Sequence, residues 1–302
     1  MGTSFAPTIE KFNMRYFRRL VLSILTLTTL FINVNAQTIK DVPFQDGENS
    51  TLVVHYKWGV INADIAEVSI QLTEEVYNNE NCIHVLAHAS TYPFWDKFFK
   101  VRDIYEAIFT ADNVKPRYFH RDVNEGNYSA QNFYHWKPNS NDVDIKVTKS
   151  TRPPLDSTLN VGRELYDLIT MVFHARSVDF EELEKKPINF VCAIDKNLMD
   201  VQLRFMGREE KNIKDLGKFN TVKVGASVTA RKGNEKSDVE SNFSVTKEGV
   251  FKGKDDVIIW FSDDSNKVPL TFRSPVAVGS INGRMVKVDG TKYPLTSQLL
   301  DE

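Results

Sequence analysis

The sequence predicts a mostly β protein of antiparallel sheets, in two β halves packed as one domain, with one central helix at about residues 162–177. Short apolar runs with alternating character recur along most of the chain, separated by polar, turn-rich links. These links are too short for the crossovers that parallel strands require. Residues 162–177 alone change to helical spacing, and they divide the strands into two groups.

Length and composition are typical of a folded globular protein. The chain has 302 residues, of which 41% are hydrophobic and 26% are charged, unlike disordered chains. The formal net charge of −2 gives no electrostatic reason to expect nucleic-acid binding. We expect a single β-rich domain over residues 37–302, with its core at residues 47–288.

The first 36 residues have the pattern of a secretory signal peptide. An apolar run over residues 20–32 follows the arginines Arg15, Arg18 and Arg19. It ends in Val34-Asn35-Ala36, which places small residues at positions −3 and −1 of a cleavage site. We therefore expect cleavage after Ala36.

The same pattern predicts the location of the mature protein. The apolar run is too short for a comfortable membrane span, so we expect a periplasmic or secreted protein without a transmembrane span in the mature chain. Met14 stands where such a signal would naturally begin, which makes it a candidate for the true start. An uncleaved N-terminal anchor is the alternative.

Cys82 and Cys192 are the only two cysteines. An exported protein can form a disulfide, and a bridge closing so long a loop would contribute about 4 kcal/mol in the chain-entropy model. The alternative, which we favour, is two buried thiols acting as small hydrophobic residues. Neither cysteine has a partner pattern typical of a metal site, and we expect no metal and no cofactor.

The strands before the helix follow from alternation and from turn residues. We expect them at residues 52–58, 60–72, 82–89, 101–109, 118–123, 128–136 and 143–148. Residues 78–81 (NNEN) have the composition of a hairpin turn. Residues 151–159 contain two prolines and are expected to form a loop. Residues 92–100 (YPFWDKFFK) are rich in aromatic side chains and have no clear period.

The helix is predicted from an apolar stripe that we expect to pack on a sheet. Its members are Leu165, Leu168, Ile169, Val172, Phe173 and Arg176. After it, strands are expected at residues 187–194, 199–207, 219–230 and 239–247. A closing meander then runs from Val257 to Val288.

The closing meander begins with residues 257–261, whose two faces are both apolar, as in a strand buried on two sides. Residues 262–266 (SDDSN) supply turn chemistry. Pro269 indicates that the next strand lies at an edge or carries a bulge. Gly279 begins the third run of the meander.

Several polar residues are candidates for chemistry, and each has a structural interpretation that we favour. Asp263 and Asp264 could bind a cation or share a proton, but Asp is also common in turns. Arg102, Asp103 and Glu106 are charged residues in an apolar strand, where a structural ion pair is the better interpretation.

No local motif for catalysis is present. His84 and His88 lie two pleats apart on one strand face, too far apart to share a metal unless the strand bends. There is no Gly-x-Ser-x-Gly elbow, no phosphate loop and no dinucleotide fingerprint. We therefore predict no catalytic residues and incline toward a protein that is not an enzyme.

The aromatic segment is the candidate ligand-binding site. Its members are Tyr92, Phe94, Trp95, Phe98 and Phe99. Trp and Phe can cover either acyl chains or sugar faces, so a lipid or a glycan is the expected ligand. Packing in the core or at its rim is the alternative.

Three stretches in this order resemble a known family. Phe99-Lys100-Val101-Arg102-Asp103 resembles a strand motif ending in Arg-Asp. Residues 166–176 resemble a helix with Asp167 at its start and Arg176 near its end. Residues 259–264, with Trp260, Asp263 and Asp264, together with Val268-Pro269-Leu270 and Gly279-Ser280-Ile281, resemble a closing meander. The order is similar to the exported bacterial family catalogued as domain of unknown function 3108, over most of residues 47–288.

The resemblance implies an exported, β-rich envelope protein without an established activity, and it implies no catalytic residues. Three hypotheses remain open: a non-enzymatic protein that binds a hydrophobic or glycan ligand, a hydrolase using dispersed carboxylates such as Asp103, Glu106 and Asp264, and a structural or assembly partner using strand edges. The sequence does not determine the oligomeric state, or whether the protein associates with the inner or the outer membrane.

Overall fold

A computed structural model of the chain describes residues 41–231, 256–275 and 279–300. The expected signal peptide and the strand expected at residues 239–247 lie outside this part. By their contacts, these described residues belong to a single unit. None of its helices has the length and apolar character that a membrane crossing needs.

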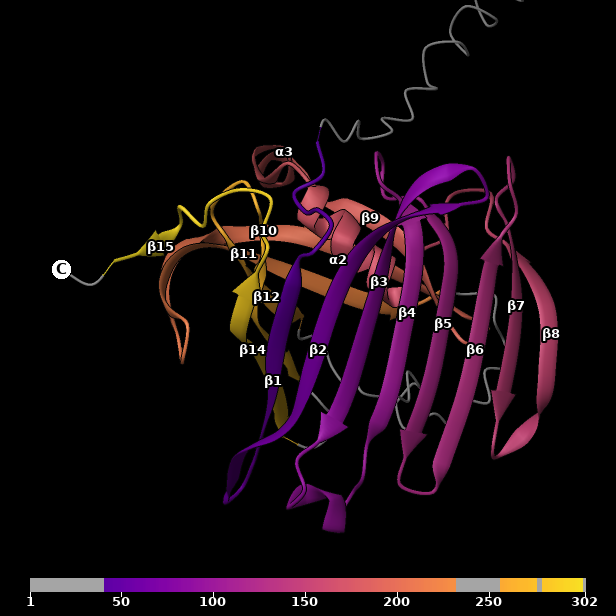
Figure 1. Ribbon diagram of the computed structural model, residues 1–302, viewed down its shortest axis with the longest axis horizontal. Coiled ribbons are helices and arrows are strands. Elements are labelled where there is room, and N and C mark those ends of the chain that lie inside the picture. The colour runs from indigo at the N-terminus through magenta and orange to yellow at the C-terminus, as the bar shows by residue number, and fades with distance from the viewer. Residues whose placement is uncertain (1–40, 232–255, 276–278, 301–302) are drawn as a thin grey trace, which may run out of the picture. The chain divides into compact units, whose positions relative to one another are not determined.

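In the described residues, fifteen strands form one antiparallel sheet (Figure 1). Those before the helices are β1 (Asn49–Trp58), β2 (Ile61–Tyr77), β3 (Glu80–Thr91), β4 (Arg102–Thr110), β5 (Pro116–Glu125), β6 (Tyr128–Trp136), β7 (Asp142–Lys149) and β8 (Arg152–Asn160). Those after them are β9 (Ile188–Ile194), β10 (Asn197–Ile213), β11 (Gly217–Ala230), β12 (Val257–Ser262), β13 (Pro269–Pro275), β14 (Ser280–Asp289) and β15 (Gln298–Leu299).

The two groups of strands are joined edge to edge. The order across the sheet is β8-β7-β6-β5-β4-β3-β2-β1-β14-β13-β12-β11-β10-β9, and β15 pairs with β11. The junction is the antiparallel pair of β1 and β14, in which Asn49 lies opposite Asp289 and Lys57 opposite Ser280. The predicted fold class is confirmed, since the described chain is mostly β, its sheet is antiparallel, and helices separate the two groups of strands.

Two-residue turns connect several of the strands in the first group. In the β2–β3 hairpin, Asn78 and Asn79 have φ of 52° and 65°, and Tyr77 pairs with Glu80. Two successive residues with positive φ are the requirement of a type I′ turn, and asparagine tolerates this conformation better than most residues. The predicted hairpin is therefore confirmed, with its turn at Asn78 and Asn79, while residues 80–81 already belong to β3.

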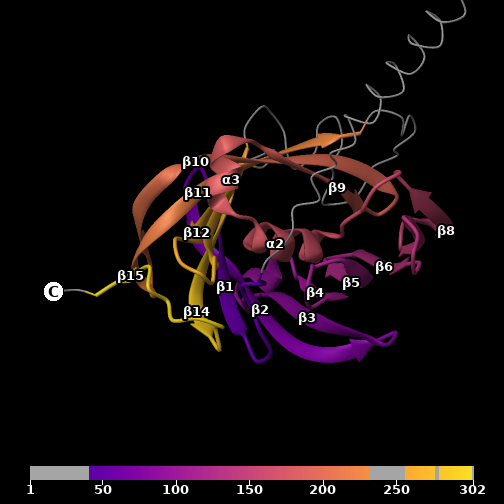
Figure 2. The same cartoon turned by 90° about the horizontal axis from the view of Figure 1, so that it is seen from above.

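The helix lies between the two groups of strands. Helix α2 (Leu168–Ser177) contacts β4 on one side and β9 on the other (Figure 2). The rings of Phe44, Phe109 and Phe173 pack with centroid separations of 5.1–5.8 Å, and Phe119 and Tyr134 pack in one cluster with Val191 and Ala193 of β9. Their side chains fill the space between the two groups.

The helix begins later than the sequence predicts. Asp167 has extended backbone geometry, and its Oδ1 accepts hydrogen bonds from the backbone N–H groups of Ile169 and Thr170, at 2.9 and 2.8 Å. This N-cap fixes the first turn at Leu168. Residues 162–167 are not helical, and Tyr166 forms a parallel bridge with Cys192 instead.

A second helix, α3 (Phe180–Lys185), was not predicted. Asp179 caps it by accepting a hydrogen bond from the N–H of Glu181 at 2.9 Å. An Asp cap followed by Glu181 and Glu182 is a sequence-level start signal. A third, shorter element is the 3-10 turn η1 (Trp95–Lys97) between β3 and β4.

Prolines lie in two strands, β8 and β13, for which the sequence made specific predictions. The expected loop at residues 151–159 is wrong, because these residues form β8, where Pro153 and Pro154 are tolerated since β8 pairs only with β7 in the described sheet. Pro269 lies in β13, which pairs on both sides, and the register shifts between Trp260 and Phe261, opposite Pro269. The bulge was therefore the correct alternative for Pro269.

Both cysteines are buried free thiols in strands, Cys82 in β3 and Cys192 in β9. Burial raises the pKa of each thiol above its usual range. Neither side chain has the depressed pKa typical of a reactive cysteine.

Candidate functional site

The aromatic segment predicted to bind ligand forms the link between β3 and β4. The N–H of Trp95 donates to the carbonyl of Tyr92 at 2.9 Å, and the N–H groups of Phe98 and Phe99 donate to the carbonyl of Trp95 at the same distance. These bonds close the η1 turn and direct neighbouring side chains outward. Phe94 contacts both Trp95 and Phe98, with ring centroids 5.2 and 5.7 Å apart.

Trp95 and Tyr92 attach this link to the neighbouring strand. The indole Nε1 of Trp95 donates to the backbone carbonyl of Asp64 at 2.9 Å, and the N–H of Tyr92 donates to the carbonyl of Ile65 at 3.0 Å. Both side chains are half-buried. Arg284 of β14 makes two 2.8 Å hydrogen bonds to the Asp64 carboxylate and holds its pKa well below the usual range. The attachment point is therefore itself fixed.

Asp96 and Arg102 join the two ends of the same link. The guanidinium of Arg102 donates to both carboxylate oxygens of Asp96, at 3.0 and 2.6 Å, and the Thr91 hydroxyl also donates to Asp96. The hydrogen bond from Arg102 lowers the pKa of Asp96. Arg102 is an exposed residue, so this ion pair lies at the surface.

Three phenylalanines of the link face solvent together with the neighbouring hairpin tip. The exposed fractions are 59% for Phe94, 72% for Phe98 and 47% for Phe99. In the β1–β2 hairpin the fractions are 53% for Trp58 and 102% for Val60. We call these five residues the aromatic end; in Figure 1 the hairpin and η1 both lie at the lower edge of the sheet.

The aromatic end is where exposed apolar side chains concentrate. Eight large hydrophobic side chains are exposed in the described residues, and five of them belong to it; the other three are Val76, Met206 and Leu300. Exposed apolar residues scattered singly are ordinary, whereas a group of them marks an interaction site. Lys57, Lys97 and Lys100 lie next to these side chains in the chain, and all three are exposed.

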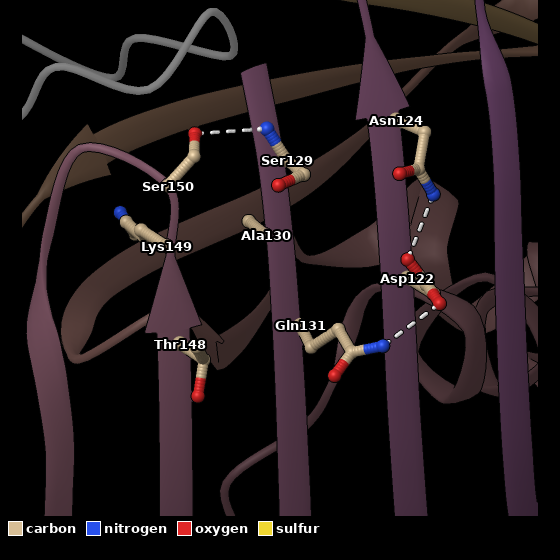
Figure 3. Close-up of a pocket in the computed structure, with 8 residues that line it drawn as sticks. All are labelled: Asp122, Asn124, Ser129, Ala130, Gln131, Thr148, Lys149 and Ser150. Atoms are coloured by element: carbon tan, nitrogen blue, oxygen red, sulfur yellow. Dashed lines mark hydrogen bonds between the residues drawn. The ribbon is translucent and has the colours of Figure 1, made fainter. Parts of the chain in front are cut away.

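A shallow pocket lies beside the β5–β6 and β7–β8 hairpins (Figure 3). Its volume is about 290 Å³, and its wall is polar apart from Ala130. Asp122 accepts hydrogen bonds from Asn124 and Gln131 at 2.8 and 2.9 Å, and Ser150 accepts one from the N–H of Ser129 at 3.1 Å. These polar groups are already paired with one another, and no residue of the aromatic end lines this pocket.

A second group of polar side chains is buried at the tip of the β9–β10 hairpin. Asp195 is 4% exposed, and its carboxylate receives hydrogen bonds from Lys149 at 2.5 Å, Asn132 at 2.6 Å and Arg121 at 3.4 Å. The Tyr134 hydroxyl donates to the Asp195 backbone carbonyl at 2.7 Å. Although burial opposes ionisation, Arg121 and the hydrogen bonds from Lys149 and Asn132 lower the pKa of Asp195. This group pins the hairpin to β5, β6 and β7.

Sequence reasoning did not identify this buried group. Arg121 and Asn132 lie directly opposite each other on β5 and β6, and Lys149 lies two residues after the buried Val147 on β7, where the alternation again places an inward side chain. A polar residue where the alternating pattern places an inward side chain was the available signal. Their partner Asp195 lies in a turn far along the chain, which the pattern does not reveal.

Arg176 ties helix α2 to two distant segments. Its guanidinium donates to both carboxylate oxygens of Glu48, at 2.6 and 3.1 Å, and to the backbone carbonyl of Asn266 at 3.1 Å. It also lies 5.3 Å from the ring centroids of Phe44 and Phe173. All of these contacts hold parts of the fold together, and the buried guanidinium does not face the aromatic end.

The remaining predicted motif residues occupy separate places. The Asp264 carboxylate accepts hydrogen bonds from Ser262 and Ser297, and Asp263 forms an ion pair with Arg208 at 3.2 Å. Trp260 donates from its indole to Glu209 at 2.5 Å. Gly279 has φ of 83°, and a Cβ there would approach the Lys57 carbonyl oxygen to 2.3 Å, so only glycine fits.

The carboxylates considered for a hydrolase do not form one set. Asp103 is buried and accepts a hydrogen bond from the N–H of Asn124 at 2.9 Å, and burial raises its pKa. Glu106 is three residues along the same strand and therefore on its other face, where it lies 2.9 Å from His84 and 3.5 Å from His120. Asp264 is held in the β12–β13 turn.

Within the described ranges, no group of three or more His, Cys, Asp or Glu side chains is arranged to hold a metal ion. His88 lies in β3 two pleats from His84. The Glu106 pair with His84 and His120 is extended by Glu75, 3.6 Å from His84 Nδ1, and the ring of His120 stacks on Phe133 at 4.4 Å. These side-chain contacts form a row that runs across the sheet from β2 to β6.

Several solved structures are similar to this chain. A β-barrel-like protein of domain of unknown function DUF1849 from Brucella abortus has a TM-score of 0.47 at 9% identity, covering 82% of this chain and 98% of its own. A candidate lipoprotein from Parabacteroides distasonis has a TM-score of 0.36 at 12% identity, covering 83% and 100%. A candidate exported protein with YmcC-like fold from Bacteroides fragilis has a TM-score of 0.34 at 10% identity, covering 83% and 99%.

Among curated proteins, no relative matches the chain. A family model described as "Protein of unknown function (DUF3108)" matches residues 52–286. This range contains Asp103, Asp167, Arg176 and Trp260, on which the resemblance in the sequence rested. The chain belongs to the DUF3108 family.

Proposed function

We propose that this protein is an exported, non-enzymatic binding protein that takes an apolar partner at its aromatic end. The observation that carries the proposal is the concentration of five of the eight exposed large hydrophobic side chains at that end. Covering them removes apolar surface from water, which contributes about 25 cal/mol per Å². The predicted site residues Phe94, Phe98 and Phe99 are the ones that face solvent.

Support for export comes from the leader pattern. Residues 1–36 combine basic residues, a short apolar run and a cleavage site after Ala36. These residues lie outside the part of the chain that the structure describes. The localisation therefore remains part of the proposal.

Support for binding rather than catalysis comes from the bonding of the candidate carboxylates. The Asp264 carboxylate accepts hydrogen bonds from Ser262 and Ser297. The Asp103 carboxylate accepts a hydrogen bond from a backbone N–H of the neighbouring strand β5. An acid catalyst needs a partner group positioned across a cleft. Asp103 and Glu106, on opposite faces of one strand, do not provide such a pair.

The shape of the site favours an apolar partner over a glycan. Sugar recognition needs hydrogen-bonding groups beside the aromatic faces, usually in a concave site. Phe94 and Phe98 instead project from a turn between two strands, and the neighbouring polar groups of Asp96 and Arg102 are paired with each other. A partner with extended apolar surface fits these contacts better.

The test is ligand capture by the purified protein. Lipid and glycan extracts are incubated with it and analysed by native mass spectrometry. We expect retained lipid, with capture lost in Phe94→Ser/Phe98→Ser. The matched control is Val76→Ser/Met206→Ser, which removes two exposed apolar side chains from elsewhere on the sheet and should leave capture unchanged.

Three outcomes contradict the proposal. Equal capture by both double variants would place the site elsewhere. Turnover of a screened substrate that disappears in Asp103→Asn or Glu106→Gln would identify a hydrolase. Absence of both capture and turnover would favour an assembly partner, for which β8, paired only with β7 in the described sheet, offers a strand edge.

A further inference from the structure

The aromatic end consists of two chain segments held at one edge of the sheet. Trp58 and Val60 come from the β1–β2 hairpin, while the three phenylalanines come from the β3–β4 link. The hydrogen bond from Trp95 to the Asp64 carbonyl and that from Tyr92 to the Ile65 carbonyl fasten the link to β2. The exposed side chains of the link therefore project from a segment that hydrogen bonds hold against β2.

The residues next to the exposed aromatic side chains in the sequence are mainly positively charged. Lys57, Lys97 and Lys100 are exposed, and none of them forms an ion pair within the described residues. The acidic residue of the link, Asp96, is neutralised by Arg102 at 2.6 Å. Each of these lysines is thus the neighbour in sequence of one exposed aromatic residue, and the one carboxylate of the link, Asp96, is already paired with Arg102.

This combination of residues distinguishes between kinds of partner. Lysine is depleted from protein–protein interfaces, whereas lysines with Trp and Phe are characteristic of the boundary between water and a bilayer. A small-molecule site would be concave, and the pocket lined by Asp122 and Lys149 contains no residue of the aromatic end. The chemistry that matches is an apolar layer covered by anionic groups.

We propose that the aromatic end docks the protein on the surface of a phospholipid bilayer that contains anionic headgroups. Phe94, Phe98, Trp58 and Val60 enter the boundary between headgroups and acyl chains, and Lys57, Lys97 and Lys100 lie among the phosphates. This inference rests on the proposed function and deepens it, because it identifies the lipid that the aromatic end takes as lipid presented at a bilayer surface.

The structure limits how deep the contact goes. Trp95 is half-buried and bonded to the Asp64 carbonyl, and Asp96 and Arg102 form a polar pair just behind the exposed rings. These groups stop the sheet from entering the apolar layer, because burying them would cost their contacts with water. The docking is therefore peripheral and reversible, and it depends on both the rings and the lysines.

Vesicle flotation tests the inference with vesicles of phosphatidylethanolamine and phosphatidylglycerol, compared with vesicles of phosphatidylcholine alone. We expect the purified protein to float with the first kind and much less with the second. Phe94→Ser/Phe98→Ser should lower the partition coefficient by at least about tenfold. Lys57→Gln/Lys97→Gln/Lys100→Gln should lower binding to the anionic vesicles and weaken its dependence on salt.

Two matched controls separate this end from the rest of the surface. Val76→Ser/Met206→Ser removes exposed apolar side chains elsewhere, and Lys146→Gln/Lys186→Gln/Lys214→Gln removes three exposed lysines elsewhere. Both should float like the parent. Phospholipid brominated in its acyl chains should quench the fluorescence of Trp58, so Trp58→Phe should lose most of the quenching. The quenching that is lost in Trp58→Phe reports on this end alone, because the fluorescence that disappears is that of Trp58.

Two results would overturn the inference alone, and a third would also reject the proposed function. One is failure of the parent protein to float with anionic vesicles while native mass spectrometry still shows aromatic-dependent lipid capture, which would leave the proposed function standing. The other is flotation that neither aromatic nor lysine substitution changes. Loss of both flotation and capture in the parent would reject the proposed function together with the inference.

Discussion

At the scale of single residues, buried charges determine much of what holds this sheet together. Asp195, Arg176 and Asp167 are each at most 4% exposed. Asp195 accepts hydrogen bonds from three distant strands, Arg176 donates to the distant Glu48 and Asn266, and Asp167 accepts from the first turn of its own helix. The sequence analysis identified Arg176 and Asp167 as structural residues. It missed Asp195, because the partners of a turn residue depend on which strands the turn reaches.

Removing the Asp195 carboxylate should strongly destabilise the fold. Asp195→Ala leaves the buried Arg121 and Lys149 without their shared counter-ion, and breaking such a buried pair costs about 3–5 kcal/mol. Urea unfolding at pH 7 measures the loss. Asp263→Ala is the control, since its pair with Arg208 is partly exposed and should cost less than about 1 kcal/mol. Similar losses for the two variants would argue against the role of burial.

The N-cap of α2 should make stability depend on pH. Burial raises the pKa of Asp167 to about 6, from 3.8, so the folded protein holds a proton here more tightly than the unfolded chain. The stabilisation by that proton is complete below pH 3.8 and is lost as pH rises through 6. Asp167→Asn keeps a capping oxygen and does not titrate.

We therefore expect Asp167→Asn to be more stable than the parent above pH 6, by up to about 3 kcal/mol. The advantage should shrink as pH falls to 4. Denaturant unfolding at several pH values between 4 and 7 measures the difference. His174, whose pKa burial lowers to about 4, is common to both proteins and cancels in the comparison. A constant difference across this range would contradict the assignment.

At the scale of elements, the sequence predicted most strands because alternation and turn residues are local properties. The turn at Asn78 and Asn79 and the bulge opposite Pro269 are examples. The predicted start of α2 was wrong because Leu165 fits the spacing of the apolar stripe but belongs to an extended segment that packs against β9. The loop predicted at residues 151–159 was wrong, because two prolines favour a loop. They fit a strand only when that strand lies at the edge of a sheet, and the sequence does not reveal that β8 does.

The predicted binding segment shows the same division between composition and placement. Its aromatic richness was visible in the sequence, but which rings face solvent depends on the hydrogen bonds of η1 and of Trp95. The contribution of Trp58 and Val60 was not predicted, because nothing local indicates that their hairpin tip lies beside residues 92–99.

The Trp95 anchor should control the mobility of the β3–β4 link. Trp95→Phe removes the indole donor to the Asp64 carbonyl, at a cost of about 1 kcal/mol. We expect faster trypsin cleavage after Lys97 and Lys100, measured by mass spectrometry of the fragments. Trp58→Phe is the matched control, because Trp58 is exposed. Equal cleavage rates in the two variants would mean that Trp95 does not hold the link.

At the scale of the whole molecule, the prediction concerns the leader at residues 1–36. The leader pattern predicts that the mature chain begins at Gln37. We expect the protein recovered from the envelope or medium of producing cells to show this terminus by N-terminal mass spectrometry. Recovery of protein that retains residues before Gln37 would favour the uncleaved anchor.

The pairing of β1 with β14 determines when the sheet can be completed. Asn49 lies opposite Asp289, so a strand made early in synthesis gains its second neighbour only when almost the whole chain exists. Contacts between residues so distant in sequence form slowly, because the intervening chain must first be ordered. Until then β1 is an open edge able to pair with another molecule. A chain that stops before β14 would therefore be prone to aggregate, even though every strand from β1 to β8 is present.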